Sequence, residues 1–141
     1  MSILVVLDTS VLIAGLRSAR GASYEVLRLI GSGAFDLCVS VPLVLEYEAV
    51  AKRLARELGL TLKDIDNVLN YLCKVAQHRL IFYLWRPALP DPRDDLVLEL
   101  AVEAGAEMII THNLRDFAGA EKFGVEPITP GEFLTRLRRI R

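Results

Sequence analysis

The chain has 141 residues, of which 52% are hydrophobic and 25% are charged, and its formal net charge is -1. This length predicts one domain spanning residues 1–141, and the hydrophobic content excludes an intrinsically disordered chain. The balanced charge excludes a protein that attracts nucleic acid through its overall field, so any RNA must be bound by a local basic patch.

The cysteines and the first apolar run indicate the compartment. Cys38 and Cys73 lie far apart without a CxxC pair, which excludes a disulfide framework and a cysteine zinc site. The apolar run at residues 3–7 is too short for a signal peptide or a membrane span. We therefore expect a cytoplasmic protein with no membrane association.

The pattern along the chain alternates strands with helices. Residues 3–7 form a continuous, β-branched run that is typical of a buried parallel strand, and a helical pattern begins at Val11 after Thr9 and Ser10. A second helix, over residues 24–30, ends at Gly31. The later predicted elements are a strand at 37–41, helices at 42–58 and 62–78, strands at 80–84 and 108–110, with a helix at 94–104 between them, a possible fifth strand at 127–129 and a helix from Pro130.

This alternation predicts a single-domain α/β fold. Strands that alternate with helices form a parallel sheet covered by helices on both faces, here an α/β/α sandwich with four to five strands. In such sheets, binding sites lie beyond the carboxyl ends of the strands. Residues that follow the predicted strands are therefore the first candidates for function.

Acidic side chains follow or flank these strand ends. Asp8 ends the first strand, Glu46 lies one turn inside the helix that begins at Pro42, Asp95 lies at the start of a helix, and Asp116 follows the fourth strand. Carboxylates brought to one point repel each other unless a cation binds among them. Oxygen ligands without a histidine or cysteine cluster favour Mg²⁺ or Mn²⁺, although the sequence leaves open whether one or two ions bind.

Each acid also has a purely structural interpretation. Asp8 is an equally good helix cap, and Asp94 and Asp95 both suit a helix N-terminus. Glu48 has Lys52 four residues later, which is typical of a surface ion pair. Glu46 has Val50 at that spacing, and so it is the acid without an ordinary surface role.

Other residues and motifs narrow the alternatives. The isolated histidines, His78 and His112, are expected to be surface or packing residues rather than ligands. The sequence contains no GxGxxG, GxxxxGK[ST] or GxSxG motif, which excludes the usual dinucleotide, P-loop and hydrolase sites. Ser10 stands where a haloacid-dehalogenase phosphatase needs a second aspartate, and the acids of a phospho-receiver domain are absent.

Four segments together resemble the PIN-domain family, most closely its VapC-like toxins. They are Leu4-Val-Val-Leu-Asp-Thr-Ser-Val-Leu12, Ser40-Val-Pro-Leu-Val-Leu-Glu-Tyr47, Asp91-Pro-Arg-Asp-Asp-Leu-Val-Leu-Glu-Leu-Ala101 and Ile110-Thr-His-Asn-Leu-Arg-Asp-Phe117. Each segment is short, but their order and spacing cover nearly the whole chain.

The resemblance implies an α/β/α, Mg²⁺- or Mn²⁺-dependent ribonuclease. It places the four family acids on Asp8, Glu46, Asp95 and Asp116, as metal ligands and catalytic residues. The third acid is ambiguous by one residue because Asp94 adjoins it, and the spacing to Leu98 and Ala101 favours Asp95.

The remaining expectations concern the substrate and partners. The family's hydroxyl position falls on Thr9 or Ser10, and its T-x-N/D element on Thr111 and Asn113. Arg17, Arg20 and Arg115 are candidates for RNA contact, with the C-terminal arginines as weaker ones. The resemblance implies an RNA substrate, a cognate antitoxin protein and a homodimer. The alternative is an RNA- or protein-binding PIN relative with a weak or inactive site.

Overall fold

Five parallel strands form the centre of the protein. The computed structural model describes residues 2–80 and 89–140, and all statements about structure refer to these ranges. The sheet has the order β3-β2-β1-β4-β5, and every pairing in it is parallel. This confirms the predicted α/β class. The strands are β1 (Leu4–Leu7), β2 (Asp36–Val39), β3 (Gln77–His78), β4 (Met108–Ile110) and β5 (Glu126–Ile128).

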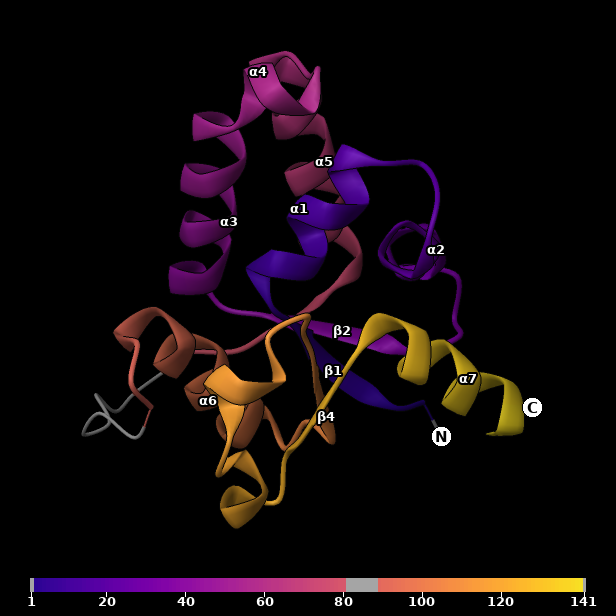
Figure 1. Ribbon diagram of the computed structural model, residues 1–141, viewed down its shortest axis with the longest axis vertical. Helices are drawn as coiled ribbons and strands as arrows, with labels where there is room; N and C mark the ends of the chain where they lie inside the picture. The colour runs from indigo at the N-terminus through magenta and orange to yellow at the C-terminus, as the bar shows by residue number, and fades with distance from the viewer. Residues whose placement is uncertain (1, 81–88, 141) are drawn as a thin grey trace.

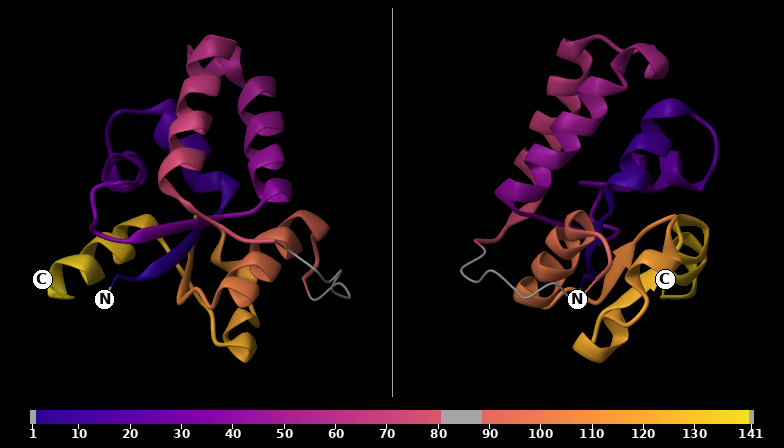
Figure 2. Two further views of the ribbon diagram at one scale, coloured as in Figure 1. Left: turned by 180° about the vertical axis from the view of Figure 1, so that it is seen from behind. Right: turned by 60° about the vertical axis from the view of Figure 1, so that its left-hand side comes forward.

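Helices cover both faces of this sheet. In Figure 1, α1 to α5 occupy the upper half of the molecule, while α6 and α7 lie in the lower half. α3 and α5 lie side by side and extend away from the sheet (Figure 2). The bounds are α1 (Thr9–Arg17), α2 (Ala22–Leu29), α3 (Val41–Arg53), α4 (Ala55–Leu58), α5 (Leu62–Val75), α6 (Pro92–Ala104) and α7 (Pro130–Ile140), with 3₁₀ turns η1 (Leu114–Phe117) and η2 (Ala120–Phe123).

The segment predicted as one helix over residues 42–58 forms two. The backbone of Leu54, at φ −95° and ψ 5°, departs from helical geometry and separates α3 from α4. Gly59 then ends α4 in the left-handed conformation that glycine adopts without steric cost. Nothing in the residue types near Leu54 signals this interruption.

The third strand lies earlier than predicted. The expected strand at residues 80–84 falls largely outside the described residues, whereas β3 is formed by Gln77 and His78. These two residues pair with Cys38 and Val39 of β2. The predicted helix over 62–78 was therefore too long at its end, because Ala76 already has the extended backbone that this pairing needs.

Local capping explains where two of the helices begin. Thr61 and Asp64 form a reciprocal capping box at α5, with hydrogen bonds of 3.0 Å and 2.9 Å. At α6 the Asp91 carboxylate accepts the Arg93 N–H at 2.9 Å, and Pro92 occupies the first helical position. The helix predicted from Asp94 therefore starts two residues earlier, at Pro92.

The core aligns the ends of the central strands. Apart from Leu4, the residues of β1 and β4 are buried, as continuous apolar runs in a covered parallel sheet should be. Leu7 pairs with Ile110, and the Asp8 N–H donates to the Ile110 carbonyl at 2.9 Å. The residues that follow β1 and β4 therefore meet at one edge of the sheet. Cys38 is a buried free thiol in this core, as predicted.

Within the described ranges, none of the helices has the length and apolar character that crossing a membrane requires.

Candidate active site

A cleft of about 350 Å³ opens beyond the carboxyl ends of β1, β2 and β4. Its walls come from α1, α3, the start of α6 and the segment after β4. This is the edge of the sheet where a parallel α/β fold places its ligands. The cleft is lined by Asp8, Thr9, Ser10, Ile13, Glu46, Val50, Arg53, Leu54, Asp91, Arg93, Asp94, Asn113 and Asp116.

Asp8 is held by side chains rather than serving as a helix cap. Its residue stands at the N-cap position of α1, but its carboxylate makes no capping hydrogen bond. Instead the hydroxyls of Ser10 and Thr111 both donate to Oδ2 at 2.7 Å. Asp8 is 6% exposed and lines the cleft, and none of the described residues donates a hydrogen bond to its Oδ1.

A second set of hydrogen bonds orients these hydroxyls. Ser10 Oγ accepts the His112 N–H at 3.2 Å, and Thr111 Oγ1 accepts the Asn113 N–H at 2.9 Å. Because each hydroxyl accepts from the backbone, its own proton is directed to Asp8. His112 is exposed, and its ring Nε2 lies 2.6 Å from the Ser23 hydroxyl.

Glu46 reaches the cleft from α3 and is positioned by two contacts. The Thr9 hydroxyl donates to its Oε2 at 2.6 Å. The neighbouring Tyr47 is fully buried and its hydroxyl donates to the Leu7 carbonyl, which joins α3 to the end of β1. Burial, followed by the charge of Asp8, raises the pKa of Tyr47 well above its usual value, so this hydroxyl remains a donor. Glu48 pairs with Lys52 at 3.1 Å, which confirms the predicted surface pair.

At the start of α6, Asp94 lines the cleft and Asp95 does not. Asp95 is 6% exposed and accepts the Leu89 N–H at 3.1 Å. On a helix these two carboxylates point about 100° apart, and of the two only Asp94 is among the residues that line the cleft. The geometry thus favours Asp94 as the third acid, where the sequence spacing favoured Asp95.

The electrostatics of Asp94 agree with this placement. Burial raises its pKa to about 7, and the charges of Asp8, Asp91, Asp116 and Glu46 contribute in the same direction. A pKa near 7 for a carboxyl group among other carboxylates means that nearby positive charge does not offset their negative charge. A cation bound in the cleft would supply that charge.

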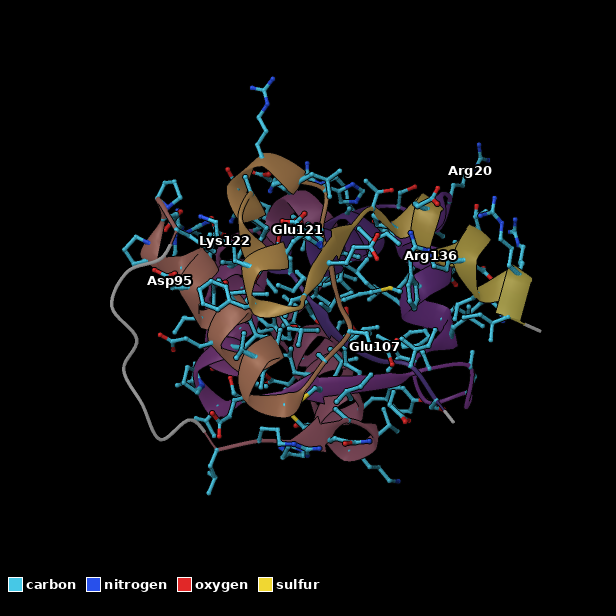
Figure 3. The ribbon with its side chains drawn as sticks, turned by 90° about the horizontal axis from the view of Figure 1, so that it is seen from below. Arg20, Asp95, Glu107, Glu121, Lys122 and Arg136 are labelled. Atoms are coloured by element: carbon cyan, nitrogen blue, oxygen red, sulfur yellow. The ribbon has the colours of Figure 1, made fainter. Side chains whose placement is uncertain are left out.

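The other predicted residues divide into two groups. Asp116, on η1, and Asn113 line the cleft with Thr9 and Ser10, while Thr111 acts through Asp8. The arginines predicted to contact RNA do not line it. Arg17 lies 3.8 Å from Glu57, and Arg20 is not among the lining residues and lies across the view from Asp95 of α6 in Figure 3. Arg115 is exposed outside the cleft.

Two arginines that sequence reasoning did not select do line the cleft. Arg93 forms an ion pair with Asp91 at 3.2 Å. Arg53 projects from the last turn of α3. Its spacing of seven residues from Glu46, two helical turns, was the available signal in the sequence.

The ligand set fits a hard cation by chemistry. Carboxylate, hydroxyl and amide oxygens line the cleft, without a cysteine or histidine, and such donors favour Mg²⁺ or Mn²⁺. Across residues 2–80 and 89–140, no three acidic, histidine or cysteine side chains are close enough together to enclose an ion.

The sequence pattern of the PIN domain matches residues 4–115, which include Asp8, Glu46 and Asp94. The chain belongs to the PIN domain family. No curated protein matches this PIN domain.

A solved structure shares the fold of this PIN domain. It is the crystal structure of VapBC2 from Rickettsia felis bound to a DNA fragment from their promoter, of which one chain superposes with a TM-score of 0.60. The two sequences are 12% identical, and the match covers 89% of this chain and 98% of the other. The likeness confirms the PIN-like fold that the four sequence segments predicted.

Proposed function

We propose that this PIN domain is a metal-dependent ribonuclease that hydrolyses RNA phosphodiester bonds. The observation that carries the proposal is Asp8. It is buried beside the cleft, two hydroxyls hold one of its oxygens, and it caps no helix. Such a fixed, partly satisfied carboxylate is of little use to stability alone, but it suits a ligand that must be ready before the ion arrives.

The acids that would hold the ion are Asp8, Asp94 and Asp116, directly or through water, with Glu46 beside them. Bound there, Mg²⁺ or Mn²⁺ would lower the pKa of water and offset charge on the phosphate. Glu46 would orient the attacking water and accept its proton, with Thr9 fixing the carboxylate through its 2.6 Å hydrogen bond. Ser10 and Asn113 would position the scissile phosphate. Asp95 is assigned a structural role at the start of α6.

Cleavage of mixed single-stranded and structured RNA in Mn²⁺ tests the proposal. The unchanged protein should cut RNA and Asp8→Asn should lose at least about 100-fold in rate, as expected for removal of a metal ligand. Asp36→Asn is a matched control because Asp36 lies at the opposite end of β2. Equal cleavage by the wild type and Asp8→Asn would contradict the mechanism.

The second candidate is a PIN module that binds RNA or protein without cutting. One observation favours it: no group of three ligands in the described part of the chain is arranged to enclose an ion. Thermal melting separates the two functions, since an ion bound to the native state must raise the midpoint. A rise in Mn²⁺ that EDTA reverses supports the nuclease, whereas no change in millimolar Mn²⁺ together with RNA binding supports the module.

The same proposal includes an antitoxin partner. VapBC2 supports it through the shared fold alone. The protein also carries an apolar groove of about 400 Å³ between α1, α2 and α5, with the side chains of Leu16, Tyr24, Leu27 and Tyr71 among those lining it. Such a groove suits the apolar face of a partner helix. Co-purification of the product of a neighbouring gene, lost in Leu27→Arg, tests this partner.

A further inference from the structure

We infer that Arg53 binds a phosphate of the RNA next to the scissile one, and so positions the substrate along α3. This inference rests on the proposed ribonuclease function and adds a residue that the four-acid site does not contain. It depends on the charge balance of the cleft, the face of α3 that lines it and the lack of an ion pair at Arg53.

The charge balance of the cleft favours a cationic contact with the substrate. Five carboxylates and two guanidinium groups line the cleft. Arg93 is already paired with Asp91 through contacts of 3.2 Å and 3.4 Å, and this hydrogen bonding raises the pKa of Arg93. A polyanion that approaches the cleft therefore meets an excess of negative charge that a single divalent ion does not fully offset.

Arg53 has no such partner. No carboxylate of the described residues lies within ion-pair distance of its guanidinium, and its side chain is exposed at the cleft. The adjacent Lys52 is different, because it bridges Glu48 at 3.1 Å and Asp66 at 2.9 Å on another face of the helix. Lys52 thus has a structural role, and Arg53 is the cation left to contact a ligand.

The geometry of α3 sets which phosphate Arg53 can reach. Four side chains of α3, its C-cap included, line the cleft from one face of the helix. Counted from Glu46, they follow at four, seven and eight residues, as Val50, Arg53 and Leu54. Seven residues span about 10 Å along the axis, so Arg53 lies away from the scissile bond when Glu46 lies beside it. Val50 lies between them on α3, and with Leu54 and Ile13 it gives the cleft an apolar lining that a ribose or base can cover. A guanidinium at this distance suits the neighbouring phosphate, which it can bind through two parallel hydrogen bonds.

Steady-state kinetics with a short single-stranded oligoribonucleotide test the inference. In Arg53→Gln, KM should rise about tenfold while kcat changes less than about twofold, because the lost contact is remote from the reacting atoms. Arg53→Lys should recover part of the affinity, as lysine keeps the charge but not the planar fork. Arg56→Gln removes the same charge three residues later, outside the cleft, and should behave as wild type.

Two further measurements identify the contact as a phosphate. The slope of log affinity against log salt should fall by about one unit in Arg53→Gln and stay unchanged in Arg56→Gln. A series of oligonucleotides with one neutral methylphosphonate linkage each should contain one that weakens wild-type binding but leaves Arg53→Gln binding unaltered. Equal KM in Arg53→Gln and Arg56→Gln, or no such linkage, would overturn the inference.

Failure of the proposed function would be seen separately. If the wild type cleaves no RNA, the nuclease proposal is rejected, and the equilibrium affinities of the same variants for the same oligonucleotides still decide the role of Arg53. Under those conditions about tenfold weaker binding by Arg53→Gln than by Arg56→Gln supports it, and equal binding overturns it.

Discussion

At the scale of single residues, the fixed orientation of Asp8 is the feature with the clearest consequence. Its Oδ2 is held by Ser10 and Thr111, and Thr111 is fully buried. Partners of this kind typically change metal affinity or activity 10–100-fold when they are removed. The hydroxyl of Thr111 should therefore matter for metal binding although it does not line the cleft.

Replacing Thr111 with valine tests this expectation. Thr111→Val keeps the shape of the side chain but removes the donor, so Mn²⁺ affinity and the rate of RNA cleavage should each fall roughly tenfold or more. Titration of the melting temperature with Mn²⁺ gives the affinity. Thr135→Val is the matched control, because the Thr135 hydroxyl bonds only the Gly131 carbonyl on α7. Wild-type affinity in Thr111→Val would show that Asp8 needs no such support.

The neighbouring aspartates of α6 give opposite predictions. Asp94→Asn should abolish the Mn²⁺-dependent rise in melting temperature and most cleavage, because Asp94 faces the cleft. Asp95→Ala should mainly lower stability, by about 1–3 kcal/mol, since it removes a buried side chain that accepts the Leu89 N–H. Thermal melting with and without Mn²⁺ separates the two effects. The reverse pattern would restore Asp95 as the third acid.

The pKa of Asp94 also predicts a dependence on pH. Because burial and neighbouring charges raise it to about 7 in the folded protein, the folded state holds its proton more tightly than the unfolded chain. Stability of the metal-free protein should therefore fall as pH rises from about 4 to 7. After allowance for screening by solvent, Asp94→Asn should be more stable at pH 8 by about 1 kcal/mol, or roughly 3 °C.

The difference between Asp94→Asn and the wild type should shrink toward pH 4, where both forms are neutral. The affinity of the protein for Mn²⁺ should also fall as pH is lowered toward 4, because protons compete with the ion for the Asp94 carboxylate. Melting curves at pH 5, 6, 7 and 8, with and without the ion, measure both effects. A constant difference across this range would show that Asp94 titrates normally.

At the scale of elements, α3 is attached to the sheet through a buried hydrogen bond. The Tyr47 hydroxyl donates to the Leu7 carbonyl at the end of β1. Tyr47→Phe leaves that carbonyl without this donor and should destabilise the protein by about 2 kcal/mol, roughly a 6 °C lower melting temperature. Cleavage should also fall, since α3 carries Glu46 and Arg53 into the cleft.

Tyr71→Phe provides the comparison for this prediction. Its hydroxyl donates to the Ile30 carbonyl at 3.1 Å but the side chain is 48% exposed, so water can replace the bond. This variant should lose little stability and no activity. An equal loss in both variants would mean that the position of α3 does not depend on the Tyr47 hydroxyl.

At the scale of the whole molecule, the predicted homodimer has a candidate surface beside the edge strand β3. Val41 and Leu45 on α3 are 64% and 58% exposed, and with Cys73 and His78 they line a small depression. Exposed apolar side chains grouped beside the outermost described strand suit an interface between copies. The dimer should show twice the chain mass of 15.7 kDa by light scattering, and Leu45→Glu should halve it.

A monomer of the unchanged protein at tens of micromolar would contradict this dimer. Leu62→Glu is the control, because Leu62 is 57% exposed at the start of α5, outside the depression. It should leave the mass unchanged.

The sequence by itself determined the order of the elements and the acids that follow the strands. Continuous apolar runs such as residues 3–7 and 108–110 are typical of buried parallel strands, and Pro42 and Thr61 favour helix starts through local contacts. Because parallel strands share one carboxyl edge, Asp8, Glu46 and Asp116 could be expected at one cleft. The strands and helix starts depend on residues close together in the chain. The shared edge follows from the parallel sheet that the alternation of strands and helices predicts.

Only the tertiary structure decided which of two adjacent aspartates faces the cleft, which arginine lines it, and whether Asp8 caps a helix. The choice of Asp94 over Asp95 depends on how α6 is rotated against the sheet, a difference of about 100° that residue types do not encode. The position of Arg53 depends on which face of α3 packs toward α1. The absence of a cap at Asp8 follows from Ser10 and Thr111, and Thr111 lies 103 positions away in the chain. Contacts of that range arise only when the whole chain is folded.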